Sequence, residues 1–259
     1  MYNLNMQIFK WNEILQSLAT GSEIPFFEKG CGISVGSFDG LHLGHRKLLS
    51  ALVEKCRERS LLPGVISFSR PLPSIKHSGD YLGDLSTLSQ RLELFEKLGL
   101  AFAIIVDFDD SFASMMGADF LNILLNVCNM SLLAEGIDFR CGFKGATDTQ
   151  AIRYWAEQNK VFSTFLDPVY YHEGSDEEER ISSSYIRNMI QKGFFTTAEE
   201  LLERPYELDI ETFRKEGAIT QILPPDGIYH TKSESGESVR LIIEERKIKS
   251  LPECKRILF

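Results

Sequence analysis

Residues 31–49 read CGISVGSFDGLHLGHRKLL. A short run that suits a buried strand leads into a glycine-rich turn, and the residues after the turn have the apolar spacing of an amphipathic helix. The first turn of a helix has unpaired backbone N–H groups and the positive end of the helix dipole, so an anion is stabilised there. The stretch therefore predicts a strand, a turn and a helix, with a phosphate site at the turn.

Two histidines make this prediction more specific. His42 and His45 are three residues apart, a spacing that puts both imidazoles on one helix face, where each can donate a hydrogen bond to the same polyphosphate. Gly44 between them has no Cβ to keep a phosphate from the backbone. Histidine can also carry charge near neutral pH, which would stabilise a negatively charged leaving group. The pattern favours nucleotidyl transfer, a reaction that depends on positioning and electrostatics.

Other interpretations of the same residues are weaker. The bare tetrapeptide His-Leu-Gly-His also fits a turn with two exposed histidines, but the preceding strand and the following helix favour the phosphate site. The sequence contains no G-x-x-x-x-G-K-[ST] or G-x-G-x-x-G motif. A metal site formed by His42, His45 and His172 would lack a recognisable fourth ligand, and the metal ligands stay unassigned.

Composition restricts the class of protein. The 259 residues are 43% hydrophobic and 25% charged, as in globular proteins with one large domain or a large and a small one. The net charge is −9 and no basic block occurs, so we expect no nucleic-acid partner. We expect no membrane partner either, because no stretch approaches the ~18 apolar residues of a membrane span. Five scattered cysteines without a C-x-x-C pair, and the lack of a secretion signal, indicate a cytoplasmic protein.

Strand and helix patterns alternate along the chain. This alternation predicts an α/β fold with a doubly wound parallel sheet, in which ligands bind beyond the carboxyl ends of the strands. A capping box, Thr87-x-x-Gln90, predicts the start of one of the helices. Beyond the short strand and helix expected within 6–19 and the central motif, the predicted strands are 64–69, 100–106, 131–135 and 161–166, and the other predicted helices include 118–128 and 149–158.

The stretch Gly36–Ser37–Phe38–Asp39–Gly40–Leu41–His42–Leu43–Gly44–His45 resembles the first motif of the bacterial FAD synthetases, which belong to the His-x-Gly-His nucleotidyltransferases. That family usually has asparagine where Ser37 stands.

A second serine-rich motif follows far along the chain. Ile181–Ser182–Ser183–Ser184–Tyr185–Ile186–Arg187 resembles the family's Ile-Ser-Ser-Thr-x-Ile-Arg. Such serines at a helix start either cap the backbone donors or help to hold a phosphate, with Arg187 supplying a planar fork one turn later. The pairing with the upstream histidines favours the phosphate role.

Two further motifs lie between these. Phe68–Ser69–Arg70–Pro71–Leu72–Pro73 resembles the family's Phe-x-Pro-His-Pro, and Gly136–Ile137–Asp138–Phe139–Arg140–Cys141–Gly142 resembles its Gly-x-Asp/Asn-Phe-x-Phe-Gly. Leu72 replaces the histidine, and Cys141 replaces an aromatic residue. The resemblance runs from about residue 32 to residue 206, with the motifs in the family's order.

The resemblance implies transfer of AMP from MgATP to FMN, which yields FAD and pyrophosphate. It implies a catalytic role for His42, His45 and Arg187. It implies ATP contacts from Gly36, Ser37, Phe38, Asp39, Gly40, Gly44, Ser183 and Ser184. It implies flavin contacts from Phe68, Arg70, Pro71, Asp138, Phe139 and Arg140. Asp39 could instead brace the turn through its own backbone.

Most bacterial relatives continue into a riboflavin kinase barrel, whose Pro-Thr-Ala-Asn signature is absent here. We expect residues 1–206 to form the nucleotidyltransferase domain, and residues 207–259 to form a small β appendage, a remnant of the barrel without kinase activity. Weak alternation predicts strands at 218–223, 227–232 and 239–244. Two alternatives stay open: transfer to another phosphorylated acceptor, and a flavin-binding protein without catalysis. Oligomeric state is not predicted.

Overall fold

The computed structural model describes residues 6–72, 74 and 81–259; Pro73 of the third motif lies outside them. The chain divides into two compact units whose segments alternate along the sequence. The first unit comprises Met1–Ser37, Arg46–Ser69 and Leu94–Pro168, and the second comprises Phe38–His45, Arg70–Glu93 and Val169–Phe259. None of the helices in the described ranges has the length and hydropathy that crossing a membrane requires.

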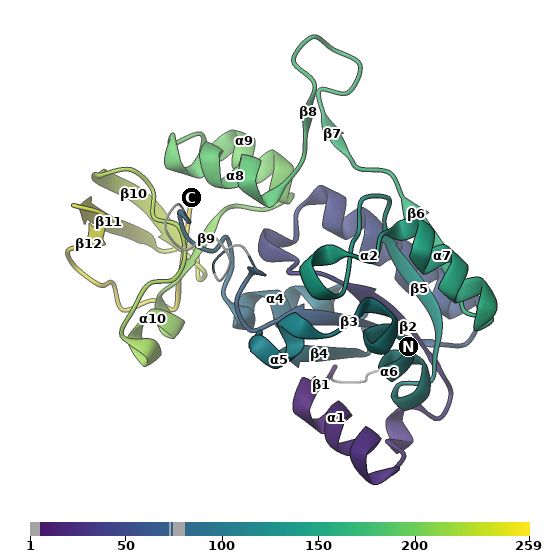
Figure 1. The fold of residues 1–259 in the computed structure, drawn as a ribbon. Helices are drawn as coiled ribbons and strands as arrows, with labels where there is room; N and C mark the ends of the chain where they lie inside the picture. The colour runs from purple at the N-terminus through teal and green to yellow at the C-terminus, as the bar shows by residue number, and fades with distance from the viewer. Residues whose placement is uncertain (1–5, 73, 75–80) are drawn as a thin grey trace. The chain divides into compact units, whose positions relative to one another are not determined.

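The first unit contains a six-stranded sheet with the order β1-β4-β3-β2-β5-β6 (Figure 1), in which every neighbouring pair is parallel. The chain passes from β2 to β3 and β4 in one direction, and then returns to β5 and β6 on the other side of β2. The predicted doubly wound sheet is therefore confirmed, with its topological switch point between β2 and β5. The strands are β1 (Gln7–Lys10), β2 (Cys31–Val35), β3 (Leu62–Phe68), β4 (Phe102–Val106), β5 (Met130–Gly136) and β6 (Phe162–Leu166).

At this switch point the two central strands separate. The register between β2 and β5 ends at the pair Ile33 and Leu133. Beyond this pair, the buried Glu135 side chain replaces a backbone acceptor: its Oε1 accepts a hydrogen bond of 2.6 Å from the Val35 N–H. Burial raises the pKa of this carboxyl group well above its usual range. A side chain thus satisfies the last donor of β2, just before the glycine-rich turn.

Helices cover both faces of the sheet. Side chains three residues apart on a strand point to opposite faces. Arg59, directly after α2, lies over the Phe162 ring, and Arg153 of α7 lies over the Phe165 ring, so α2 and α7 cover opposite faces. The Trp155 indole N–H donates to Asn122 of α6, which places α6 with α7. The α-helices of this unit are α1 (Trp11–Thr20), α2 (Leu43–Glu58), α4 (Leu88–Lys97), α5 (Asp110–Ser114), α6 (Gly117–Val127) and α7 (Thr149–Gln158). The first residues of α2 and α4 belong to segments of the second unit.

The second unit contains a five-stranded sheet with the order β12-β11-β10-β13-β9 and a two-stranded hairpin, β7–β8. The predicted strands at 227–232 and 239–244 are present as a hairpin, but the predicted strand at 218–223 is wrong, since only Gln221 there forms an isolated bridge, with Asp84. In its segment from Val169 on, the strands and α-helices are β7 (Tyr170–Tyr171), β8 (Glu179–Arg180), α8 (Ser183–Gln191), α9 (Phe195–Leu202), β9 (Glu207–Asp209), α10 (Ile210–Glu216), β10 (Gly227–Ser233), β11 (Ser238–Glu244), β12 (Lys247–Ile248) and β13 (Arg256–Leu258).

One hydrophobic core joins the helices and the sheet of this second unit. Ile186, Ile190 and Leu201 come from α8 and α9, and Leu241 and Ile257 come from the sheet; all five are fully buried in the same cluster. The predicted boundary divides the sequence once, at residue 206, whereas each compact unit is built from three separate segments of the chain. The boundary therefore stays a prediction.

Candidate functional site

The turn after β2 has left-handed backbone at Phe38, Gly40 and Leu41, with φ of 47°, 76° and 41°. Gly40 is the position that requires glycine, because an added Cβ would lie 2.7 Å from Leu85 Cδ1. Its N–H donates to Ser86 Oγ at 2.9 Å. The turn is therefore held in one conformation by residues 85 and 86.

The two histidines lie side by side. His42 immediately precedes α2, which begins at Leu43, and the imidazoles of His42 and His45 stack with ring centroids 3.7 Å apart and planes 21° apart. Phe38 meets His45 edge-on at 5.3 Å. The Nδ1 atoms of both histidines are buried, and the described part of the chain offers neither of them a hydrogen-bond partner. The two rings lie together as expected, but His42 has extended backbone and precedes the helix, so helical spacing is not what brings them together.

Burial controls the protonation of this pair. Burial, followed by the positive charges of Arg180, Arg204 and Arg187, lowers the pKa of His42 from 6.5 to about 3. Burial, followed by the neighbouring His42, lowers the pKa of His45 well below its usual value. The expectation that these histidines carry charge near neutral pH is therefore wrong for this structure. Both imidazoles are neutral, and the positive potential at the site comes from the arginines.

Arg187 is paired with Asp39. The Arg187 Nη2 donates to Asp39 Oδ2, and both side chains are buried. Arg187 Nε donates to the Gly83 carbonyl at 2.8 Å, and its Nη2 donates to the Tyr81 hydroxyl at 3.1 Å. The planar guanidinium is thus fixed by several acceptors at once.

Asp39 also accepts hydrogen bonds from the backbone N–H groups of Leu85 and Ser86, each at 3.0 Å. It therefore holds the turn to residues 85 and 86, and the expectation that it acts through its own backbone is wrong. Sequence reasoning missed Tyr81 and Gly83. The only local signal was the Gly83–Asp84 pair, which is typical of a turn.

The three serines at the start of α8 have different contacts. Ser182 is the N-cap, and its hydroxyl accepts from the Tyr185 N–H at 3.2 Å. The Ser183 hydroxyl donates to the Asp39 carbonyl at 2.8 Å, while Ser184 is exposed. An added Cβ at Gly44 would lie 4.0 Å from the Ile181 carbonyl, so the histidine and serine motifs meet.

The candidate flavin residues are distributed over both units. In the first unit, Phe68 ends β3 and packs edge-on against Phe108 and Phe112. In the same unit Asp138, Phe139 and Arg140 follow β5, with the first and last exposed, and Arg140 Nε donates to the Gly145 carbonyl at 2.7 Å.

The other two candidates belong to the second unit. Arg70 pairs with the buried Asp84, with 3.3 Å between Nε and Oδ2, and Pro71 is buried. Gly36 and Ser37 end the first segment of the first unit, directly before the turn. No group of three His, Cys, Asp or Glu side chains suited to a metal ion occurs among the residues that the structure describes.

Comparison with known proteins identifies the family. The family model described as FAD synthetase matches residues 25–185, which include the histidine motif and most of the serine motif. The chain belongs to the FAD synthetase family. Arg187 of the serine motif lies two residues beyond the matched range.

Among the relatives of this family member is the FAD synthetase of Listeria monocytogenes, 25% identical over 78% of this chain and 80% of the relative. The bifunctional riboflavin kinase/FMN adenylyltransferase of Bacillus subtilis is 26% identical over 78% of this chain and 67% of the relative. The corresponding Escherichia coli protein is 28% identical over 76% of this chain. The chain spans 61% of the length of that protein.

A solved structure shares the fold. The crystal structure of a macrolide-efflux protein from Streptococcus pneumoniae matches with a TM-score of 0.65 and 20% identity, over 88% of this chain and 85% of that one. A likeness at this identity supports the fold alone.

Proposed function

We propose that the protein is an FMN adenylyltransferase, which transfers AMP from MgATP to FMN and gives FAD and pyrophosphate. The single observation that carries the proposal is the stacked pair of buried histidines, whose Nδ1 atoms have no partner within the described residues. A buried polar atom without a partner costs free energy, and a phosphate oxygen at the glycine turn would supply one. The positive charges of Arg180, Arg204 and Arg187 act on His42.

In this proposal the FMN phosphate attacks the α-phosphorus of ATP, and pyrophosphate leaves. His42 and His45 act as neutral hydrogen-bond donors to the triphosphate. Arg187 and Asp39 act as a unit, in which the carboxylate orients the guanidinium toward the leaving pyrophosphate. Mg²⁺ arrives with ATP as part of the substrate and neutralises phosphate charge.

Backbone and serine groups complete the proposed ATP contacts. The glycine turn allows close approach of a phosphate to the backbone, and the start of α8 presents backbone N–H groups. The proposed ATP-binding residues are Gly36, Ser37, Phe38, Asp39, Gly40, Gly44, Ser183 and Ser184, and the proposed flavin-binding residues are Phe68, Arg70, Pro71, Asp138, Phe139 and Arg140.

We further propose that the protein works in the reducing cytoplasm and that residues 207–259 have no riboflavin kinase activity. The free cysteines support the first statement: burial raises the pKa of Cys56, Cys128 and Cys141 to about 12, so these thiols stay protonated and serve as buried apolar groups.

The test is to incubate the purified protein with MgATP and either FMN or riboflavin, and to follow flavins and pyrophosphate by chromatography. FAD and pyrophosphate in equal amounts from FMN, with no FMN from riboflavin, is the expected result. FMN from riboflavin would contradict the absence of kinase activity. Absence of FAD would contradict the transferase function, and binding of FMN without turnover would then indicate a flavin-binding protein.

A further inference from the structure

Residues 81–87, which we call the strap, hold both partners of the buried ion pair. The Tyr81 hydroxyl and the Gly83 carbonyl accept from Arg187. The N–H groups of Leu85 and Ser86 donate to Asp39. The positions of the Arg187 guanidinium and the Asp39 carboxylate therefore depend on where the strap backbone lies.

The strap is itself held by residues 220–222, within the same compact unit. Asp84 N–H donates to the Thr220 carbonyl at 2.8 Å, and Ile222 N–H donates to the Asp84 carbonyl at 2.9 Å, which forms a parallel bridge between Asp84 and Gln221. This is the stretch for which the sequence predicted a strand of the appendage. Its backbone pairs with the strap and not with the five-stranded sheet.

Gly83 contacts both Arg187 and residues 221 and 222. Its carbonyl accepts from Arg187, and it has a φ of +125°. An added Cβ would lie 2.5 Å from the Ile222 nitrogen and 2.8 Å from the Gln221 carbonyl carbon. Residues 221 and 222 therefore pack directly on the backbone unit that binds the guanidinium, and only glycine fits between them.

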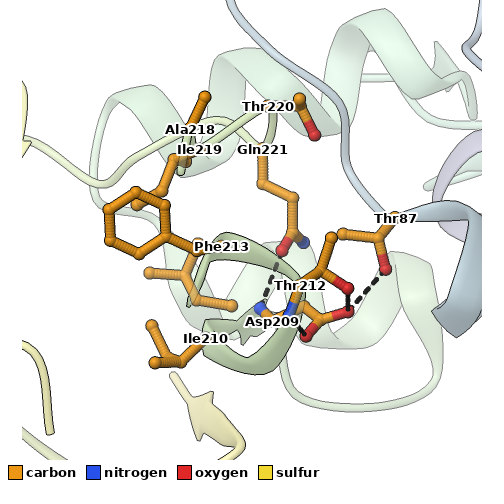
Figure 2. Close-up of a pocket in the computed structure, with 10 residues that line it drawn as sticks. Thr87, Asp209, Ile210, Thr212, Phe213, Ala218, Ile219, Thr220 and Gln221 are labelled. Carbon is orange, nitrogen blue, oxygen red and sulfur yellow. Dashed lines mark hydrogen bonds between the residues drawn. The ribbon is translucent and has the colours of Figure 1, made fainter. Parts of the chain in front are cut away.

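The Gln221 side chain adds three hydrogen bonds. Its Oε1 accepts from the Asp209 N–H at 2.7 Å, and its Nε2 donates to the carbonyls of Leu85 at 3.1 Å and Glu207 at 2.8 Å. The side chain is 6% exposed and uses both amide protons. Figure 2 shows Gln221 beside Asp209, whose carboxylate also accepts from the Thr87 hydroxyl at the end of the strap.

We propose that Gln221 is a positioning residue for the Asp39–Arg187 pair. Its side chain ties the strap to β9, so that the C-terminal segment sets the orientation of the guanidinium. The role in turnover rests on the proposed function, because it assumes that this guanidinium stabilises the leaving pyrophosphate. The positioning itself concerns hydrogen bonds of the protein alone.

The test compares Gln221→Ala with Thr231→Ala in the full chain. Thr231 also belongs to the C-terminal segment, but its hydroxyl bonds to the Val239 carbonyl within the β10–β11 hairpin and not to the strap. The first measurement is amide hydrogen exchange at Leu85 and Ser86, with Ile33 and Ile104 of the central sheet as references. We expect exchange at Leu85 and Ser86 to be about tenfold faster in Gln221→Ala, since the Leu85 carbonyl loses the amide that ties it to β9, and unchanged in Thr231→Ala.

The second measurement is the kinetics of FAD formation. We expect kcat to fall about tenfold in Gln221→Ala with the KM for FMN unchanged, because the interaction lost is one that acts on the transition state. Equal exchange at residues 85 and 86 in both variants, or a kcat equal to that of Thr231→Ala, overturns the proposal. If the wild-type protein makes no FAD, the proposed function is contradicted. The exchange data alone then test whether Gln221 positions the strap.

A second variant covers the case in which Gln221→Ala does not fold. Gln221→Glu keeps the acceptor for the Asp209 N–H and loses the donors to Leu85 and Glu207. We expect faster exchange at Leu85 in this variant as well. Protection equal to the wild type overturns the proposal.

Discussion

At the scale of single residues, the site combines neutral donors with a fixed positive charge. His42 and His45 are neutral because they are buried, and Arg187 is oriented because Asp39, Gly83 and Tyr81 accept from it. A preorganised donor of this kind stabilises developing charge without reorganising during the reaction.

The contribution of His45 can be measured directly. Removing one such donor typically raises the barrier by about 2.7–4 kcal/mol, so we expect His45→Ala to form FAD roughly 10²–10³ times more slowly. His172→Ala is the matched control, because that histidine is exposed and lies in the β7–β8 hairpin region. Turnover by His45→Ala within a few-fold of the control would contradict the assignment.

Protonation of His42 should make stability depend on pH. Its pKa falls from 6.5 to about 3 on folding, so between these values the unfolded chain binds the extra proton and the free energy of unfolding decreases as pH falls. For this group we expect a loss of about 1.4 kcal/mol between pH 7.5 and 5.5. Urea denaturation at both pH values measures it, and His42→Gln should lack this part of the loss. Equal pH dependence in both proteins would show that His42 is not buried in its neutral form.

At the scale of elements, two helix starts show how local sequence signals work. The capping box predicted at residues 87–90 is present, with Thr87 N–H donating to Gln90 Oε1 at 2.9 Å and Gln90 N–H donating to Thr87 Oγ1 at 3.3 Å. At α8 the cap is Ser182, which precedes the two serines proposed to contact ATP.

The structure therefore predicts that Ser182 and Ser184 contribute differently to the free energy of unfolding. Ser182→Ala should lower the free energy of unfolding by about 1 kcal/mol, because the Tyr185 N–H loses its acceptor. Ser184→Ala should change it by less than about 0.5 kcal/mol, since Ser184 is exposed. Denaturant titration of the two variants makes the comparison. A larger loss for Ser184→Ala would mean that the cap is wrongly assigned.

At the scale of the whole molecule, the C-terminal segment shares its core with earlier parts of the chain. Leu241, Ile243 and Ile257 are buried in one cluster with Ile186 and Leu201 of the two preceding helices. In a fragment of residues 207–259 these side chains would lose the apolar partners that α8 and α9 supply.

A fragment of residues 207–259 should therefore be unfolded in isolation. Far-UV circular dichroism and one-dimensional NMR of the fragment measure this, with the full chain as the reference. A dispersed spectrum and a cooperative thermal transition in the fragment would show that it is an independent domain, in support of the predicted boundary at residue 206.

Sequence patterns alone predicted the helices and strands whose formation depends on residues close together in the chain. The predicted helix 149–158 coincides with α7, and the strand predicted at 131–135 lies within β5. Hydrophobic periodicity and capping are local, so a single sequence displays them. The predicted strand at 218–223 failed because the Thr220 carbonyl and the Ile222 N–H pair with Asp84, in a distant segment, and alternation does not reveal the partner.

The sequence by itself determined the α/β class and the glycine turn after β2, since each follows from local patterns along the chain. Only the tertiary structure decided that His42 and His45 are neutral, because desolvation depends on everything packed around them. It also decided that Asp39 binds Arg187 and that residues 220–222 hold the strap. These contacts join residues more than 130 positions apart, and no local pattern encodes which distant groups meet.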